Sequence, residues 1–220
     1  MTRTATATKI FKPCPRWPTE ERPSTAARQM SFTKEVEPLL EKMVQGRGKF
    51  PDGIDYKDVC IIALGAFTMY RSGDIRKMKW SHFFDSNGQC KEFIAISAEV
   101  KTYKGRTIMI ADRLKSVLEI CFNESCDDVS DYILPNLDGK PMSQRMMNKR
   151  ITMIAAQFRM KHFSTHSLRK AGARQMYDLM GADFEALMHV QLLLNHANPR
   201  TTMRYIGITD EKINRAIKSM

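Results

Sequence analysis

The chain has 220 residues, 43% of them hydrophobic, which is enough for one substantial core. Its 35 lysines and arginines outnumber 24 aspartates and glutamates, and the net charge of +11 favours a polyanionic partner, nucleic acid first among them. The longest hydrophobic stretch, residues 61–69, is too short to cross a bilayer, and the five scattered cysteines match neither a disulfide framework nor a zinc motif. We therefore expect neither a membrane protein nor a secreted disulfide scaffold.

Residues 1–30 predict a flexible basic arm ahead of one principal domain over residues 31–220. The arm contains Thr/Ala repeats, four of the nine prolines, and six basic residues that are opposed only by Glu20 and Glu21. It suits either a tail that follows DNA or a disordered leader, and the sequence leaves both open.

The spacing of apolar residues predicts a series of helices interrupted by one hairpin. A helix capped by Thr33 begins the domain, and the segment 58–70, apolar nearly all round, predicts a central buried helix. Strands at 92–96 and 106–110 flank a turn that carries Lys101. Further helices are expected at 73–79, 111–122, 143–159, 167–180, 183–194 and 209–219. The predicted fold class is therefore mainly α with a small antiparallel β-sheet.

Positive charge is concentrated in the second half of the chain. No Asp or Glu interrupts the segment 140–177, and such a run is typical of a surface that contacts phosphates. A solvated basic face is the ordinary alternative, so the run favours nucleic acid without deciding it. Its basic residues are Lys140, Arg145, Lys149, Arg150, Arg159, Lys161, Arg169, Lys170 and Arg174.

Several residues of types that act on phosphodiesters have ordinary structural alternatives when taken singly. Arg71 follows the apolar segment 58–70, where a salt bridge to Asp74 would explain it as well as a site would. His166 and Arg169 are three residues apart at a helix start, so they share one face beside the positive end of the helix dipole. That pattern recurs by chance in basic helices.

The same holds for two residues nearer the C-terminus. His196 closes an apolar segment and precedes Ala-Asn-Pro, so a helix C-cap is its ordinary explanation. Tyr205 alone would be a half-buried aromatic residue. The order and spacing of the whole set, however, favour a site that breaks a phosphodiester bond without a metal.

In that order these residues resemble the signature of the tyrosine recombinase (phage integrase) family, which runs Arg, Lys, His-x-x-Arg, His or Trp, and Tyr. The nine-residue step from His196 to Tyr205 is the family's usual one. The resemblance covers roughly residues 31–220 and implies the catalytic-domain fold that the family shares with type IB topoisomerases. Residues 69–80, 165–170 and 194–205 are similar to the three boxes of the family, and 101–110 to its lysine hairpin.

The resemblance implies a role for each of these residues. Tyr205 would be the nucleophile, forming a 3′-phosphotyrosine link and freeing a 5′-hydroxyl without ATP or a metal. Its phenol, with an ordinary pKa of about 10, would need a nearby base, for which His166 is suited. The other implied roles are phosphate clamping by Arg71 and Arg169, protonation of the leaving oxygen by Lys101, hydrogen bonding of the phosphate by His196, and support of Arg71 by Asp74.

The implied partner is double-stranded DNA. The resemblance further implies a homo-oligomer, a tetramer on paired DNA sites, and allows for a DNA-bending accessory protein. The helix at 209–219 would dock on a neighbouring protomer or on its own domain. No cofactor, metal or membrane partner is expected, and the implied setting is the bacterial cytoplasm or nucleoid, for a bacterial or phage-encoded protein. Outside the catalytic set, the residues expected to contact DNA are Lys104, Arg106, Arg145, Lys149, Arg150, Lys170, Arg200 and Arg204.

Two departures from the family pattern stand out. The family usually places a helical core-binding domain of about a hundred residues ahead of this one, whereas only the arm of residues 1–30 stands there. We interpret the chain either as a naturally short recombinase, similar to the inversion recombinases of fimbrial switches, or as an excised domain. The segment 181–192 is longer than in many relatives, which would adjust how His196 is presented.

Two other functions stay open at this point. Type IB topoisomerases use related chemistry, so relaxation of a single duplex is the nearest rival, and a strand-exchange product would separate the two. A DNA-binding regulator with an idle site is the rival from another class. Such a protein would bind DNA without forming a covalent adduct.

Overall fold

The computed structural model describes residues 27–46, 53–96, 106–208 and 218. The predicted arm up to residue 26, the hairpin turn with Lys101 and Lys104, and nearly all of the predicted helix at 209–219 lie outside these residues. In the described part of the chain no helix is long and apolar enough to span a bilayer.

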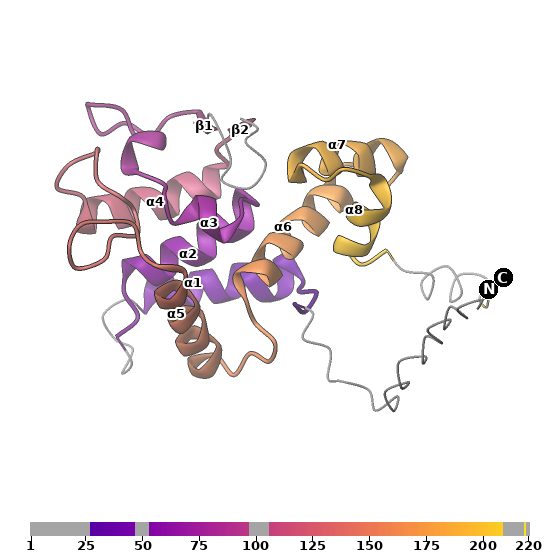
Figure 1. Cartoon of the computed structure of the whole chain (residues 1–220), viewed down its shortest axis with the longest axis horizontal. Helices are drawn as coiled ribbons and strands as arrows, with labels where there is room; N and C mark the ends of the chain where they lie inside the picture. The colour runs from indigo at the N-terminus through magenta and orange to yellow at the C-terminus, as the bar shows by residue number, and fades with distance from the viewer. Residues whose placement is uncertain (1–26, 47–52, 97–105, 209–217, 219–220) are drawn as a thin grey trace, which may run out of the picture.

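The described residues form eight α-helices and one antiparallel hairpin (Figure 1). In the hairpin, Phe93 of the first strand pairs with Met109 of the second, and Ile96 pairs with Arg106. The elements in chain order are α1 (Glu37–Gln45), α2 (Tyr56–Phe67), α3 (Ser72–Ile75), β1 (Phe93–Ile96), β2 (Arg106–Met109), α4 (Asp112–Ser125), α5 (Gln144–Gln157), α6 (Thr165–Leu179), α7 (Phe184–Leu194) and α8 (Pro199–Tyr205).

Helix α2 lies at the centre of the main core and is buried on nearly every side. Helices α4 and α6 pack against it. Gly172 of α6 permits a very close approach, because a Cβ at this position would lie 1.9 Å from the carbonyl oxygen of Ala66. Since α2 leads into Arg71 and α6 carries Arg169, this approach sets the spacing between the two arginines.

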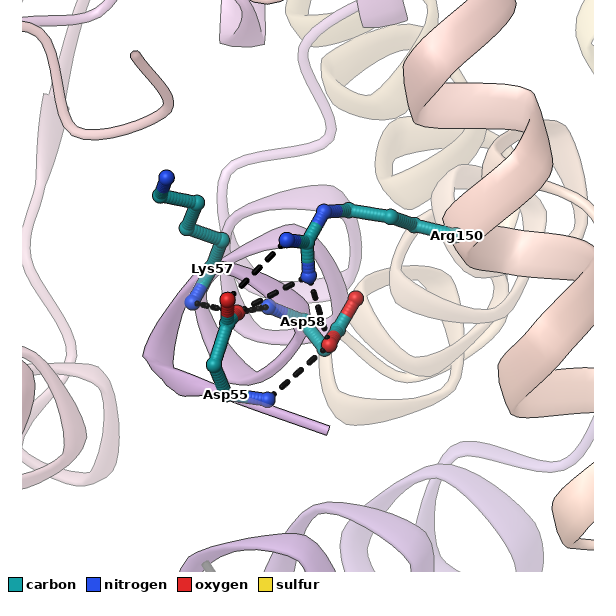
Figure 2. Close-up of polar contacts among 4 residues, drawn as sticks. All are labelled: Asp55, Lys57, Asp58 and Arg150. Atoms are coloured by element: carbon teal, nitrogen blue, oxygen red, sulfur yellow. Dashed lines mark hydrogen bonds and ion pairs between the residues drawn. The ribbon is translucent and has the colours of Figure 1, made fainter. Parts of the chain in front are cut away.

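A network of charges joins the start of α2 to α5 (Figure 2). Asp55 caps α2 by accepting hydrogen bonds from the backbone amides of Lys57 and Asp58. Arg150 donates to both carboxylate oxygens of Asp55 at 2.9 Å and to Asp58 at 2.8 Å. Because Asp58 is only 2% exposed, Arg150 neutralises a carboxylate that would otherwise be buried without a counter-charge.

A second, smaller core lies where α6, α7 and α8 meet, on the right of Figure 1. Met69, just after α2, contributes to it. The other buried members lie on α6, on α7 and just after α8, and Met203 and Tyr205 of α8 pack against them; these buried members are Ala173, Tyr177, Ala186, Leu187, Val190, Leu194 and Ile206. This core fixes α7 and α8 against the helix that carries His166 and Arg169.

Most predicted elements occur within a few residues of their predicted bounds, with two local corrections. The first helix is capped by Ser31, not by the predicted Thr33, because the Ser31 hydroxyl accepts from the amide of Lys34 at 3.3 Å. A π-helical turn, Phe32–Val36, then leads into α1. Helix α8 was not predicted, although Asn198 followed by Pro199 is a favourable N-cap and first-turn pair.

Candidate active site

Arg71 and Arg169 converge on one backbone carbonyl. Arg169 lies near the start of α6 with only 3% of its surface exposed, and its Nη2 donates to the Leu194 carbonyl at 2.9 Å. Arg71 directly precedes α3, and its Nη2 lies 3.4 Å from the same oxygen. Leu194 is the last residue of α7, where unsatisfied carbonyls and the helix dipole attract cations. The end of α7 therefore holds two guanidinium groups side by side.

The turn after α7 presents His196. Asn195 ends the helix in the left-handed region at φ 52°. The His196 amide donates to the Gln191 carbonyl, and the Gln191 side-chain amide donates back to the His196 carbonyl, both at 3.1 Å. The ring is held as well, because its Nδ1 lies 3.0 Å from the Thr202 hydroxyl oxygen.

Helix α8 places Tyr205, its last residue, against both histidines. The Tyr205 ring lies edge-on to the ring of His166 at a centroid distance of 4.8 Å and to that of His196 at 5.1 Å. The Tyr205 hydroxyl oxygen is 3.4 Å from His166 Nδ1. This is a long hydrogen bond, of the kind that tightens when a substrate orders the groups around it.

The electrostatics of the site keep these three groups uncharged. Burial, together with the positive charges of Arg169 and Arg71, lowers the pKa of His166 and of His196 to about 4. Burial raises the pKa of the Tyr205 hydroxyl well above its ordinary value, and the two arginines act against this rise. At neutral pH the site therefore holds two neutral imidazoles and a phenol beside two cations.

These groups line one cleft of about 470 Å³. Five of the six predicted catalytic residues lie on its wall, and the sixth, Lys101, lies outside the described residues. Asp74 is buried in α3, three residues after Arg71, and its backbone amide donates to the Arg71 carbonyl at 2.9 Å. Its support of the Arg71 side chain stays a prediction. The lining residues are Tyr70, Arg71, Ser72, Thr165, His166, Arg169, His196, Thr201 and Tyr205.

A second hollow of about 720 Å³ shares His166, Thr201 and Tyr205 with the cleft. Two predicted DNA contacts, Lys170 and Arg204, line it. Lys170 Nζ lies 5.9 Å from the centroid of the Tyr205 ring and donates to the carbonyl of Ala27 at 3.0 Å. Burial lowers the pKa of Lys170. Positive charge thus extends from the cleft past the tyrosine.

The other predicted DNA contacts differ in their surroundings. Arg145, Lys149 and Arg200 are exposed. Arg150 is bound to Asp55 and Asp58 (Figure 2), so the structure gives it a structural role that the sequence did not predict. Its contact with phosphate stays a prediction that would have to compete with two carboxylates. Lys104 and the side chain of Arg106 lie outside what the structure describes.

Sequence reasoning missed Thr202, which contacts the His196 ring. The sequence did carry a signal: Thr202 lies six residues after His196, and the turn at Asn198-Pro199 brings the chain back so that the two side chains can meet. Among the described residues no group of three or more His, Cys, Asp or Glu side chains is placed to hold a metal ion. The cleft lining offers a ligand the guanidinium groups of Arg71 and Arg169 and the rings of two histidines, a set of hydrogen-bonding groups and positive charges suited to a phosphate group.

A model of the phage integrase family matches residues 32–212, so the chain belongs to that family. It is 30% identical over 123 residues to the probable integrase/recombinase YoeC of Bacillus subtilis (strain 168), covering 56% of this chain and 65% of that protein. The fold is similar to that of XerA recombinase, with a TM-score of 0.61, 19% identity, 91% of this chain covered and 66% of that one.

Other solved structures share the fold as well. A lambda integrase dimer bound to a COC′ core site matches with a TM-score of 0.58 at 18% identity, over 82% of this chain and 48% of that one. These likenesses confirm the predicted fold class. The chain spans somewhat less than two thirds of the length of the relatives named first, XerA recombinase and YoeC.

Proposed function

We propose that this protein is a site-specific recombinase that cuts and rejoins DNA strands through a 3′-phosphotyrosine intermediate. The observation that carries the proposal is the single cleft in which Tyr205 meets two histidines and two arginines. Family membership supports it independently. A phosphoryl group in transfer carries negative charge on its non-bridging oxygens, so fixed donors around a nucleophile are what the reaction needs.

In the proposed reaction, the Tyr205 oxygen attacks a backbone phosphorus atom, forming a Tyr–O–P bond and breaking the bond to the 5′-oxygen. Arg71 and Arg169 hold the non-bridging oxygens, a task suited to planar guanidinium groups. His196 donates a hydrogen bond to the same phosphate. Attack by the free 5′-hydroxyl of another strand reverses the bond changes, so the energy of the broken bond is conserved without a nucleotide cofactor.

The phenol proton passes to His166, whose Nδ1 lies 3.4 Å from the Tyr205 hydroxyl oxygen. In the free protein the charges of Arg169, Lys170 and Arg71 help to hold the pKa of this histidine low. An anionic phosphate between the arginines offsets those charges, and the basicity of His166 rises as the substrate binds. Lys101 completes the proposal as the donor of a proton to the leaving 5′-oxygen.

The proposed partner is double-stranded DNA, contacted by the exposed basic residues around the cleft. Several related structures are DNA complexes, among them XerH site-specific recombinase with its difH substrate and the Tn1549 transposon integrase with circular intermediate DNA. We further propose a tetramer on paired sites, a DNA-bending accessory protein, and a cytoplasmic, nucleoid-associated location. The net charge of +11 is consistent with a DNA partner.

The test is covalent trapping on a nicked duplex whose sequence has been selected from a randomised library by binding to the protein. Wild type should form a covalent protein–DNA species in the presence of EDTA. Tyr205→Phe, which lacks only the attacking oxygen, should bind the duplex and form none. Tyr132→Phe is the matched control at a tyrosine outside the cleft, and it should behave as wild type.

The outcomes separate the proposal from its rivals. No adduct with wild type would favour a DNA-binding regulator with an idle site. An adduct that leads only to relaxed plasmid, with no exchanged strands between two sites, would favour a topoisomerase. An adduct that persists in Tyr205→Phe would contradict the assignment of the nucleophile.

A further inference from the structure

Thr202 is a buried polar residue that no part of the proposed reaction uses. It lies in the middle of α8 with its surface completely covered. Its hydroxyl oxygen lies 3.0 Å from Nδ1 of His196, and this is its one hydrogen bond among the described residues. This hydroxyl therefore hydrogen-bonds a ring that lines the cleft, and it can control which ring nitrogen carries the hydrogen.

The direction of this hydrogen bond follows from the needs of the two groups. If Nδ1 carried the hydrogen, the Thr202 hydroxyl oxygen would accept a hydrogen bond from it. The hydroxyl's own hydrogen would then be buried without an acceptor. If the hydroxyl donates to Nδ1, its hydrogen is satisfied and only an oxygen lone pair is left over. The second arrangement costs less, because an unsatisfied buried donor carries the larger penalty.

The donating hydroxyl fixes the tautomer of His196. A neutral imidazole has one N–H, so an Nδ1 that accepts from Thr202 leaves the hydrogen on Nε2. The pKa of His196, lowered to about 4, keeps the ring neutral at physiological pH. Nε2–H is then a hydrogen-bond donor on a residue that lines the cleft, whereas the other tautomer would offer a lone pair to an anionic phosphate and repel it.

We propose that Thr202 is a positioning residue that holds His196 in its Nε2–H tautomer, so that this ring can donate to a non-bridging oxygen of the scissile phosphate. The proposal rests on the proposed function for the identity of the ligand. The tautomer itself does not depend on that function. Two further contacts position His196. The Tyr205 ring packs edge-on against its ring, and the Gln191 side chain donates a hydrogen bond to its backbone carbonyl.

The first experiment reads the tautomer directly in the free full-length protein, by ¹⁵N–¹H correlation spectra of the histidine rings at neutral pH. His196, assigned with the help of His196→Asn, should show a protonated Nε2 and an accepting Nδ1. A dominant Nδ1–H form in wild type would overturn the proposal. This readout needs no DNA, so its outcome is distinct from a failure of the recombinase assignment.

The second experiment uses two variants of nearly equal size. Thr202→Val removes the hydroxyl and keeps the shape, so the Nδ1 signal should shift to that of a free acceptor and the rate of covalent adduct formation should fall at least about tenfold. Thr202→Ser keeps the donor and should restore the Nδ1 signal and most of the rate. Thr152→Val, at an exposed threonine of α5, controls for the loss of a hydroxyl from a helix.

The pairing of the two readouts distinguishes positioning from a general loss of structure. If Thr202→Val leaves both the Nδ1 signal and the cleavage rate unchanged, the proposal is wrong. If Thr202→Ser behaves like Thr202→Val in both measurements, the hydroxyl is not the active feature and the proposal is also wrong. Circular dichroism of both variants checks that the fold is retained.

Discussion

Arg71 supplies one of the two guanidinium groups that line the cleft beside Tyr205. Arg71→Ala removes a charged donor to the transition state, so we expect cleavage to slow by about a hundredfold or more, measured as covalent adduct in single turnover. Folding should be retained, because Arg71 is only partly buried. Arg113→Ala, at an exposed arginine of α4, should cleave as wild type does. Normal cleavage by Arg71→Ala would remove this residue from the site.

The low pKa of His196 predicts how stability changes with pH. This pKa is about 4 in the folded protein against an ordinary 6.5, so between these values the unfolded chain binds a proton that the folded protein does not. The free energy of unfolding therefore falls as the pH is lowered through this window. His196→Asn removes the contribution, and its urea midpoint should drop less than that of wild type between about pH 7 and pH 5.

His166 acts in the same direction, so the single variant should reduce the pH dependence without abolishing it. An equal drop in the urea midpoint for wild type and His196→Asn would mean that His196 titrates alike in both states. A larger drop in the variant would reverse the sign of the argument.

At the scale of elements, the close approach of α2 and α6 holds the two arginines in place. Gly172→Ala would put a Cβ 1.9 Å from the Ala66 carbonyl oxygen, so the helices must separate. We expect the free energy of unfolding to fall by about 1–3 kcal/mol, measured by urea denaturation. Gly73→Ala, where an added Cβ meets nothing within 4 Å, should not destabilise. Equal stability of the two variants would contradict this account of the helix contact.

Two arginines of α5 should separate structural from DNA-binding roles. Arg150→Ala leaves Asp58 buried without its counter-charge, which costs about 3 kcal/mol of unfolding free energy. Arg145→Ala, at an exposed position on the same helix, should leave stability unchanged and weaken DNA binding. Urea denaturation and fluorescence anisotropy with a labelled duplex measure the two effects. The opposite pattern would show that Arg150 is the DNA contact.

The elements differ in how far the sequence could predict them. Apolar spacing indicated α2, α4, α5, α6 and α7 because each buries one face or more against the core, and the hairpin because its strands flank a polar turn. Helix α8 was not predicted, because seven residues are too few to show a clear apolar period and Asn198-Pro199 comes directly after a predicted helix end. The candidate site residues were predicted from their order along the chain, and five of them line one cleft. Thr202 and the Arg150 network were not, because both depend on which side chains the fold brings together.

At the scale of the whole molecule, the net charge of +11 and the cleft lined by cations both favour an anionic ligand. His166 and Arg169 lie on α6 and Tyr205 ends α8, two of the three helices that meet in the small core. His196 follows α7, and Arg71 lines the same cleft from the segment between α2 and α3. In the proposed complex, the exposed basic residues of α5 and α8 would contact the phosphates of the duplex outside the cleft. Membership of the phage integrase family is consistent with this arrangement.

The central claim is that Tyr205 becomes covalently linked to a 3′-phosphate of DNA. The most direct test is mass spectrometry of the trapped wild-type complex after digestion with a protease and a nuclease. We predict a peptide containing Tyr205 that carries a nucleotide through its 3′-phosphate on the tyrosine oxygen. A nucleotide attached to any other residue, or linked through a 5′-phosphate, would contradict the account.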